Sequence, residues 1–500
     1  MITPTPTKTQ YEAVIGLETH VQLRTTSKMF CACGADYQSS EPNTRVCPVC
    51  LALPGTLPVV NRQAVEYAMM IGLALNCQIA PITKFDRKNY SYPDLMKGYQ
   101  ISQFDMPICF EGYVDLPTAP PHRVRINRVH MEEDVAKLTH IAGPDGREGH
   151  SLMDVNRAGV PLMEVVTEPD LRSTDQVIAY IESLQSIIRY LGVGTANMEE
   201  GSFRCDANVS VRPKGHDKLT TKVEVKNMNR VGAVARAIEY EIERQIGVYE
   251  SGGRVTQDTR GWDDATGTTR PQRSKEEAND YRYFAEPDIP PLEIDEAWIT
   301  EVKARLPELP AQRKARLMND WGLSDYDAAL ITASRVTAEY FDQVVRPVAA
   351  AGKKEKATVA KEAANWMNGE MLRLMNESRK SSPFDTKIAP TQLASLVDRF
   401  RRRELNSGTA KQVFEEMWRS GKDPETIIED RGFSMVSDTS ELEKHVDEAI
   451  KNSPKAVEDY LAGKEASAKF LMGQVMKATK GQADPPLVQQ LIAEKLNALR

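Results

Sequence analysis

The chain has 500 residues, of which 41% are hydrophobic and 27% are charged, the composition of an ordinary soluble globular protein. This length is too great for one hydrophobic core, so about two to four domains are expected. The net charge of −7 excludes a surface coated with positive charge, so any RNA contact must come from a local basic region.

Residues 1–10 form a Pro/Thr-rich segment that we predict to be a disordered tail. It has neither the basic start nor the apolar core of a secretory signal. The longest apolar run, residues 68–75, is too short for a membrane span. Four of the seven cysteines lie within residues 31–50, which indicates a metal site in a reducing, cytoplasmic setting rather than disulfides.

Residues 11–23 alternate as a strand, with Ile15, Leu17 and Val21 on one face and Glu18 and His20 on the other. A carboxylate and an imidazole that project on the same side can form part of a metal site. A pair of solvent-facing residues would show the same pattern, and the alternation alone leaves both interpretations open.

The first two cysteines, Cys31 and Cys33, are followed by the pair Cys47 and Cys50. Two close pairs joined by a short loop can present four thiolates tetrahedrally, as in a closed structural zinc site. Because such a site has no open coordination position, we predict that it holds the loop and takes no part in catalysis.

Residues 84–103 combine several Lys, Arg and Tyr residues with Pro and Gly, which is typical of a loop that binds phosphate and offers aromatic surfaces. Residues 123–137 form another strand-like run that ends in Glu132, Glu133 and Asp134. Neighbouring carboxylates repel one another unless they are solvated or share a cation.

A helix predicted over residues 173–191 leads into residues 198–212, where Asp206, Asn208 and Ser210 alternate with apolar residues. Residues 222–226 repeat this pattern with Glu224 and Lys226. Several strands with acidic polar faces predict a sheet face that binds phosphate and a divalent metal. No P-loop, H-E-x-x-H or G-x-S-x-G motif is present in the sequence, so metal-assisted phosphoryl chemistry is the mechanism that the sequence favours.

Beyond a Pro-rich boundary near residue 291, the chain has helical spacing and few strand signals. We predict a helical domain over 295–405 and a helical tail domain over 406–500. The last forty residues carry a local excess of cations, Lys464, Lys469, Lys477, Lys480, Lys495 and Arg500. Phosphate contact needs such an excess, although a solvated charged face would look the same.

Several long motifs occur in order along the chain: GLETHVQL (16–23), KFDRKNYSYPD (84–94), HMEEDVAK (130–137), DVNRAGVPLMEVVTEPD (154–170), MEEGSFRCDANVSVR (198–212) and FLMGQVMKATKG (470–481). Together they resemble the B subunit of tRNA-dependent amidotransferases, which convert Asp-tRNA(Asn) or Glu-tRNA(Gln) to the amide. The pattern departs from the family at Gln272 and Ala285, where Met and Pro are expected.

The resemblance implies an α+β chain whose residues 11–294 form a cradle domain similar to the glutamine synthetase/guanidino kinase fold. This domain would use ATP and Mg²⁺ to phosphorylate the amino acid's side-chain carboxylate. Ammonia would come from a glutaminase A subunit, a small C subunit would complete a heterotrimer, and the C-terminal tail would hold the misacylated tRNA. The sequence leaves open which tRNA is used and whether an aminoacyl-tRNA synthetase joins the complex.

The resemblance also implies site residues. The Mg²⁺ ligands and catalytic residues would be Glu18, His20, Glu133, Asp206 and Glu224, with Glu132 as the alternative to Glu133. The candidate phosphate contacts are Arg87, Lys88, Arg204 and Lys226. Cys31, Cys33, Cys47 and Cys50 would bind a structural Zn²⁺.

Two competing hypotheses remain at this point. A free-standing ligase similar to glutamine synthetase would not need the basic tail. A zinc-containing tRNA-binding scaffold without catalysis would have no use for acids on several strands, and replacement of His20 or Glu133 would test it.

Overall fold

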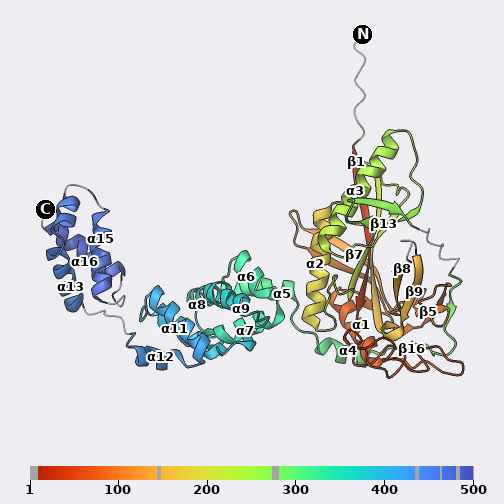
Figure 1. Cartoon of the computed structure of the whole chain (residues 1–500), viewed down its shortest axis with the longest axis horizontal. Helices are drawn as coiled ribbons and strands as arrows, with labels where there is room; N and C mark the ends of the chain where they lie inside the picture. Colours follow the sequence, from red (N-terminus) through yellow and green to blue (C-terminus); the bar gives the residue numbers. More distant parts are fainter. Residues whose placement is uncertain are drawn as a thin grey trace, which may run out of the picture. The chain divides into compact units, whose positions relative to one another are not determined.

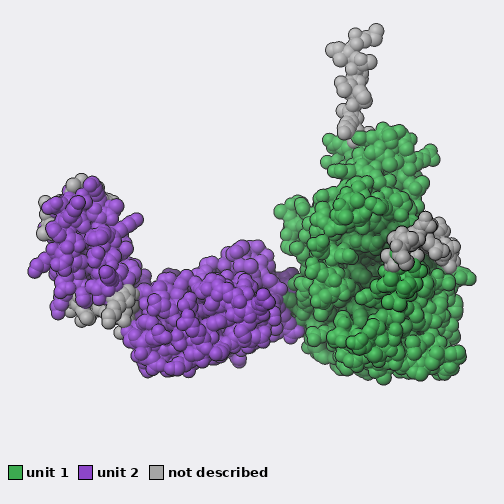
Figure 2. Space-filling model, in the orientation of Figure 1, with its two compact units in different colours: residues 1–309 green, residues 310–500 purple. Residues whose placement is uncertain are grey.

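The computed structural model describes residues 10–143, 148–272, 281–433, 439–461, 466–479 and 485–498, together with Lys464 and Ala483. Two compact units are present, residues 1–309 and residues 310–500 (Figure 2). Apart from Gln10, the predicted disordered tail lies outside the described residues, as do Lys480 and Arg500 of the predicted basic excess.

A nine-stranded sheet forms the centre of the first unit (Figure 1). Its neighbouring strands are antiparallel except for the parallel pair β12 and β13. In spatial order the strands are β14 (Thr268–Pro271), β13 (Asp258–Asp263), β12 (Val223–Lys226), β11 (Phe203–Pro213), β1 (Tyr11–Gln22), β10 (Pro161–Thr167), β7 (His122–Glu133), β6 (Cys109–Leu116) and β2 (Gln78–Ile79).

Three small sheets accompany the large one. They are β15 (Phe284–Ala285) with β4 (Asp86–Asn89) and β5 (Tyr99–Ser102), β16 (Leu292–Glu293) with β3 (Ile82–Thr83), and the hairpin β8 (Lys137–Ala142) with β9 (Glu148–Asp154). A single 3₁₀ turn, Val155–Arg157, follows β9.

Helices cover one face of the large sheet: α1 (Arg62–Ala74), α2 (Thr174–Leu191) and α3 (Val231–Glu250) share a hydrophobic core with the strands. The alternation predicted in the first strand is confirmed, because Ile15, Leu17 and Val21 are buried in this core. The opposite, polar face carries Glu18 and His20. Helix α2 begins where Ser173 accepts a hydrogen bond from the Gln176 N–H, and it ends at Gly192, whose φ of 74° suits a residue without Cβ.

In strand β7, the residues that face the core switch from even-numbered to odd-numbered positions part-way along the strand. Val124 and Ile126 point into the core before the change, and Val129 and Met131 do so after it. The register against β10 shifts between Val166 and Thr167, which marks a β-bulge. The bulge therefore decides which residues at the end of β7 reach the polar face.

The first unit extends beyond the predicted boundary at residue 294. Helix α4 (Glu296–Ala304) packs Val302 into the first core, and Trp298 and Arg305 donate hydrogen bonds to Glu66 of α1. The division therefore falls after Leu309.

The described part of the second unit is helical. Its helices are α5 (Pro310–Trp321), α6 (Asp325–Thr332), α7 (Arg335–Val345), α8 (Lys353–Trp366), α9 (Leu372–Glu377), α10 (Pro390–Arg401), α11 (Ser407–Ser420), α12 (Pro424–Arg431), α13 (Thr439–Lys451), α14 (Pro454–Leu461), α15 (Ser467–Ala478) and α16 (Pro485–Ala498). None of the helices in the described residues combines the length and apolar character that a membrane span requires.

Two separate cores lie in the second unit, one built by residues 317–427 and the other by residues 442–496. Val413, Phe414 and Ile427 belong to the first of these, so that core continues beyond the predicted boundary at residue 405. The coarser part of the fold prediction is confirmed: this is a mixed α/β chain with a sheet-rich N-terminal part and a helical C-terminal part.

Candidate active site and metal centres

The polar face of the large sheet brings residues from four strands into one row. His20 of β1 lies opposite Arg204 of β11 and Glu164 of β10, and Glu164 lies opposite His130 of β7. Glu132 follows His130 on the same face of β7. Directly opposite partners in a sheet lie close enough for their side chains to interact, so the register itself assembles the site.

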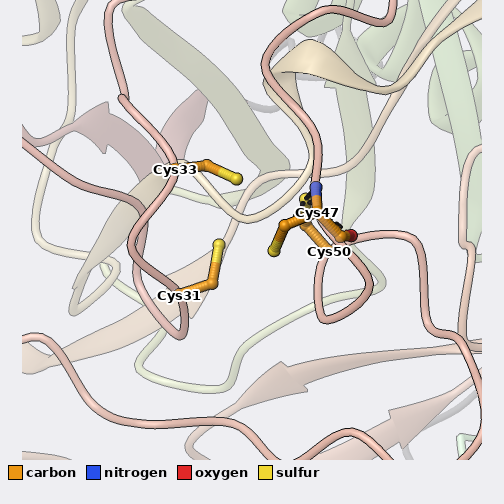
Figure 3. A group of neighbouring side chains, drawn as sticks. All are labelled: Cys31, Cys33, Cys47 and Cys50. Carbon is orange, nitrogen blue, oxygen red and sulfur yellow. Dashed lines mark hydrogen bonds between the residues drawn. The ribbon is translucent and has the colours of Figure 1, made fainter.

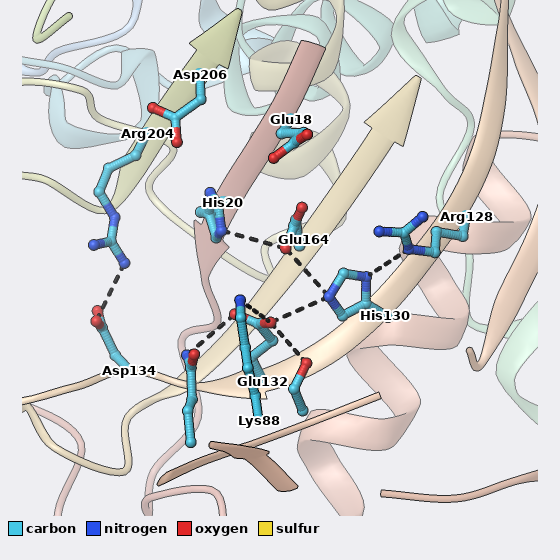
Figure 4. A network of polar contacts seen from close by, with 12 residues as sticks. Glu18, His20, Lys88, Arg128, His130, Glu132, Asp134, Glu164, Arg204 and Asp206 are labelled. Atoms are coloured by element: carbon cyan, nitrogen blue, oxygen red, sulfur yellow. Dashed lines mark hydrogen bonds and ion pairs between the residues drawn. The ribbon is translucent and has the colours of Figure 1, made fainter. Parts of the chain in front are cut away.

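The side chains of this row converge (Figure 4). His130 Nε2 lies 3.2 Å from both Glu132 Oε1 and Glu164 Oε2, and His20 Nε2 lies 3.4 Å from Glu164 Oε2. Candidate ligand atoms of His20, Glu132 and Glu164 all lie within 4.8 Å of one another. Two carboxylates and an imidazole at this spacing can share one cation.

Two adjoining cavities of about 340 and 430 Å³ open over this row. Both are lined by residues of the sheet face and of the segment around β4: His20, Lys88, Tyr90, Glu132, Asp206 and Lys226. Glu18, His130 and Glu164 line the larger cavity together with aromatic side chains, and Arg204 lines the smaller one. We call the two cavities together the cleft.

Neighbouring cations keep Glu132 and Glu164 ionised. Burial alone would raise the pKa of Glu132, but Lys88 and His130 lower it to about 2. Burial likewise opposes ionisation of Glu164, and His130 and His20 hold its pKa well below the ordinary range. For His130, burial acts to lower the pKa, whereas Glu164 and Glu132 raise it to about 9. The cleft therefore combines the ionised carboxylates of Glu132 and Glu164 with the imidazolium of His130.

Cations line the same cleft. Lys226 Nζ lies 2.6 Å from Asp206 Oδ2 and 3.4 Å from Glu224 Oε1. Lys88 Nζ lies 3.9 Å from Glu132 Oε1. Arg204 donates a hydrogen bond of 3.2 Å to the buried Asp134, which fixes the direction of its guanidinium. Fixed cations beside acids suit a ligand that carries both phosphate and metal.

A third cavity, of about 290 Å³, is lined by Glu133. The Glu133 carboxylate forms an ion pair with Lys97 and accepts a hydrogen bond of 3.0 Å from the Ile101 N–H. Cys31 and Cys50 line the same cavity. Glu133 therefore faces the cysteine loop, not the row around His20.

The four cysteines of the predicted zinc loop form one cluster (Figure 3). Their sulfurs lie within 4.8 Å of one another, and Cys50 Sγ is 3.9 Å from Cys47 Sγ. A tetrahedral site with Zn–S bonds of about 2.3 Å places its sulfurs roughly 3.8 Å apart. The donor set and its spacing therefore fit a closed zinc site.

The thiols of this cluster differ in pKa. A hydrogen bond from Cys31, with a contribution from the Lys28 ammonium, lowers the pKa of Cys50 to about 4. Burial raises the pKa of Cys33 to about 11. The surroundings therefore favour the thiolate form of Cys50 over that of Cys33.

Comparisons with known proteins decide the family. The family model described as "GatB/GatE catalytic domain" matches residues 13–300, and the one described as "GatB domain" matches residues 346–496. The B subunit of an aspartyl/glutamyl-tRNA(Asn/Gln) amidotransferase from Moorella thermoacetica is 53% identical over 97% of this chain and 100% of its own length. The chain belongs to the family of amidotransferase B subunits.

Other members of this B-subunit family give the same result. The protein of the same name from Dehalococcoides mccartyi is 51% identical over 98% of this chain and 99% of its own length. The one from Caldicellulosiruptor saccharolyticus is 49% identical over 98% and 100%. The resemblance predicted from the motifs is confirmed.

The structure brings together most of the predicted metal residues. Glu18, His20 and Asp206 lie along the cleft, where Asn208 donates a hydrogen bond of 2.9 Å to Glu18 Oε1. Glu224 is buried beside the cleft and accepts a hydrogen bond from Thr259. The expectation that differs is Glu133, because the parity change in β7 places Glu132, the stated alternative, in the cleft.

Of the predicted phosphate contacts, Lys88, Arg204 and Lys226 line the cleft and Arg87 does not. Successive residues of β4 point to opposite faces, so Arg87 turns away from Lys88. Its guanidinium binds both carboxylate oxygens of Glu286 at 2.7 Å and lies over the Tyr99 ring. Arg87 of β4 therefore holds the residue that directly follows β15.

The sequence prediction missed two members of the row, His130 and Glu164. His130 lies in the run 123–137 that was predicted to end in acids, and Glu164 lies in the motif of residues 154–170. The strand pairing that places Glu164 between His20 and His130 joins distant parts of the chain, and alternation within a single strand contains no signal for it.

Proposed function

We propose that this chain is the carboxylate-activating subunit of an ATP-dependent tRNA amidotransferase. It transfers a phosphoryl group from ATP to the side-chain carboxylate of glutamate on tRNA(Gln), of aspartate on tRNA(Asn), or of both. Ammonia then replaces phosphate and leaves the amide. The observation that carries this proposal is the convergence of His20, Glu132 and Glu164 in a cleft lined by cations, in a chain of the B-subunit family.

The residues of the cleft that would hold Mg²⁺ are His20, Glu132 and Glu164, with Glu18, Asp206 and Glu224 beside them. Carboxylate oxygens are the ligands that Mg²⁺ prefers, so the donor set fits. When bound, Mg²⁺ neutralises charge on the transferring phosphoryl group. Glu224 acts by orienting Lys226, whose Nζ lies 3.4 Å from its carboxylate.

The chain's own cations bind the phosphates in this proposal. Lys88 and Lys226 contact phosphate oxygens directly, and Arg204, held by Asp134, offers planar donors from the smaller cavity. The aromatic residues Tyr90, Tyr281 and Tyr283 line the larger cavity and reduce the access of water. A site poor in water strengthens these electrostatic contacts and protects an activated carboxylate from hydrolysis.

The partners follow from the same proposal. The relatives are named as the B subunit of an amidotransferase, and such a name implies further subunits. We propose a heterotrimer in which a glutaminase A subunit supplies ammonia and a small C subunit completes the assembly.

The tRNA contact is proposed for the C-terminal helices, with the core at residues 442–496 as the tail domain. Lys495 and Lys464 are each paired with an aspartate, Asp447 and Asp459. Lys469 and Lys477 of α15 form no ion pair among the described residues, so they are the cations most available to a phosphate backbone. Phe470 between them is 55% exposed and can stack on a base.

Two finer assignments complete the proposal. We assign the first unit to the cradle folds of the glutamine synthetase/guanidino kinase class. The mostly antiparallel sheet, with one face covered by helices and one polar face, supports this assignment. We also assign a structural Zn²⁺ to the four cysteines, where it fixes the loop 31–50. The spacing of the sulfurs supports this assignment.

The deciding experiment measures amide formation on Glu-tRNA and Asp-tRNA by the chain assembled with A and C partners, ATP, Mg²⁺ and ammonium. We expect amidated tRNA with stoichiometric release of phosphate from ATP, and loss of both with His20→Ala or Glu164→Gln. Wild-type rates in both variants would refute the cleft as the active site and favour a non-catalytic tRNA scaffold.

A further inference from the structure

The side chain of Lys28 is fully buried beside the four-cysteine cluster. Its exposed fraction is 0%, although it lies in a loop segment that leads into Cys31. Lysine is almost never fully buried unless its charge is paired. The position of Lys28 therefore requires a partner for its ammonium.

The backbone and the neighbouring residues fix where Lys28 lies. Its N–H donates a hydrogen bond of 2.9 Å to the carbonyl of Cys33, so it is tied to the first cysteine pair. Its side chain packs against Gly159: a Cβ added to that glycine would lie 3.4 Å from Lys28 Cδ and 3.8 Å from Cys50 Cβ. Lys28 is therefore a neighbour of both cysteine pairs.

Apart from the cysteines themselves, the described residues offer the ammonium little compensation. Nζ donates one hydrogen bond, to the carbonyl of Val155, at the long distance of 3.5 Å. An ammonium has three donors. Lys28 has no ion pair with a carboxylate anywhere in the described ranges, whereas Lys97, at the cavity that Cys31 and Cys50 line, is paired with Glu133. Burial of an uncompensated charge is strongly unfavourable.

We propose that Lys28 is the built-in counter-ion of a zinc tetrathiolate at Cys31, Cys33, Cys47 and Cys50. Four thiolates around Zn²⁺ carry a net charge of −2, and one buried ammonium reduces the charge of the group to −1. This inference rests on the zinc site proposed above.

The coupling works in both directions. Zinc supplies the negative group that makes a buried Lys28 favourable, and Lys28 makes it harder to lose the metal by protonation of the thiolates. Without zinc, the cysteines offer Lys28 less negative charge than the tetrathiolate does, and among the described residues its ammonium donates only one long hydrogen bond, so its burial destabilises the loop. Lys28 is a positioning residue for the metal and touches no reacting group.

The test compares zinc retention by the wild-type chain and Lys28→Met, which keeps an unbranched stem and removes the charge. Lys84→Met is the matched control, because Lys84 is a half-buried lysine already paired with Asp86 and Asp105. Zinc affinity is measured by competition with a chromogenic chelator, and the melting temperature Tm is measured with and without zinc.

We expect Lys28→Met to bind zinc about 10- to 100-fold more weakly, the range for residues that support metal ligands. Its zinc-free form should be at least as stable as the zinc-free wild type, so the increase in Tm caused by zinc becomes smaller. Lys84→Met should lower Tm equally in both forms and leave zinc affinity unchanged.

Equal zinc affinity in wild type and Lys28→Met would overturn the counter-ion role, and so would an equal loss of Tm with and without zinc. If Lys28→Met does not fold, Lys28→Arg and Lys28→Gln decide, since only the charged replacement should retain zinc. A wild-type chain that binds no zinc would overturn the zinc site and its counter-ion together. Zinc binding with no dependence on Lys28 would overturn the counter-ion alone.

Discussion

Glu132 and Glu133 are consecutive residues of β7, and their carboxylates lie in different cavities. Glu132 Oε1 is 3.2 Å from His130 Nε2 in the cleft, whereas Glu133 forms an ion pair with Lys97 beside the cysteine loop. The bulge in β7 decides this assignment, because it changes which alternate residues face the core.

Glu132→Gln should abolish most amide formation, because it removes a charged oxygen from the proposed Mg²⁺ site while keeping its shape. Loss of a supporting residue alone costs about 10- to 100-fold in metal affinity, so loss of a ligand should cost at least about 100-fold. The measurement is the Mg²⁺ dependence of amide formation. Glu133→Gln is the matched control and should leave the Mg²⁺ requirement unchanged; an equal shift in both variants would contradict the assignment.

His130 should support Glu132 and Glu164 without binding substrate. Its Nε2 lies 3.2 Å from an oxygen of each, and its side chain is almost fully buried. His130→Gln keeps a polar group there but removes the imidazolium that balances the two acids. We expect the Mg²⁺ concentration at half-maximal rate to rise about 10- to 100-fold, with a smaller change in kcat at saturating Mg²⁺. A loss of kcat that high Mg²⁺ does not restore would indicate a direct catalytic role instead.

The contrast between Lys226 and Arg87 gives a third prediction. Lys226 lines the cleft, so Lys226→Met should raise the KM for ATP by about 10-fold or more, as expected for a charged phosphate contact. Arg87 binds Glu286 outside the cleft, so Arg87→Met should lower Tm and leave the KM for ATP near the wild-type value. Steady-state kinetics and thermal unfolding of both variants separate these outcomes.

Glu224 and the tail cations should affect different steps. Glu224→Ala leaves Lys226 without one of its two acidic neighbours, and we expect amide formation to be nearly abolished while tRNA affinity is kept. Replacement of Lys469 and Lys477 by Gln should do the reverse, with weaker tRNA binding and a reduced dependence on salt. Filter binding at two salt concentrations and single-turnover amidation test this, and parallel losses in both variants would refute separate sites.

The sequence was sufficient for features that depend on one strand or one loop. Alternation within β1 and β11 placed Glu18, His20 and Asp206 on a polar face, and the cysteine spacing predicted the cluster. Features that depend on strand pairing could not be predicted from the sequence alone. Glu164 and His130 join the site only through the register of β10, and the choice between Glu132 and Glu133 depends on a bulge whose position alternation does not reveal.

The attachment of α4 to the first unit should depend on pH through Glu66. Burial acts to raise the pKa of Glu66, but hydrogen bonds from Arg305, Arg62 and Trp298 lower it below the ordinary glutamate value. A carboxyl with a lowered pKa in the folded state adds stability above its unfolded pKa, about 4.3, and loses that contribution as pH falls through its folded pKa. Glu66→Gln removes the titrating charge and keeps the size of the side chain. We therefore expect the variant to lower the free energy of unfolding by about 1–3 kcal/mol at pH 7, with a smaller difference near pH 4. Urea unfolding of both proteins at the two pH values measures this, and a difference that stays constant or grows toward low pH would show that the Glu66 charge does not hold α4.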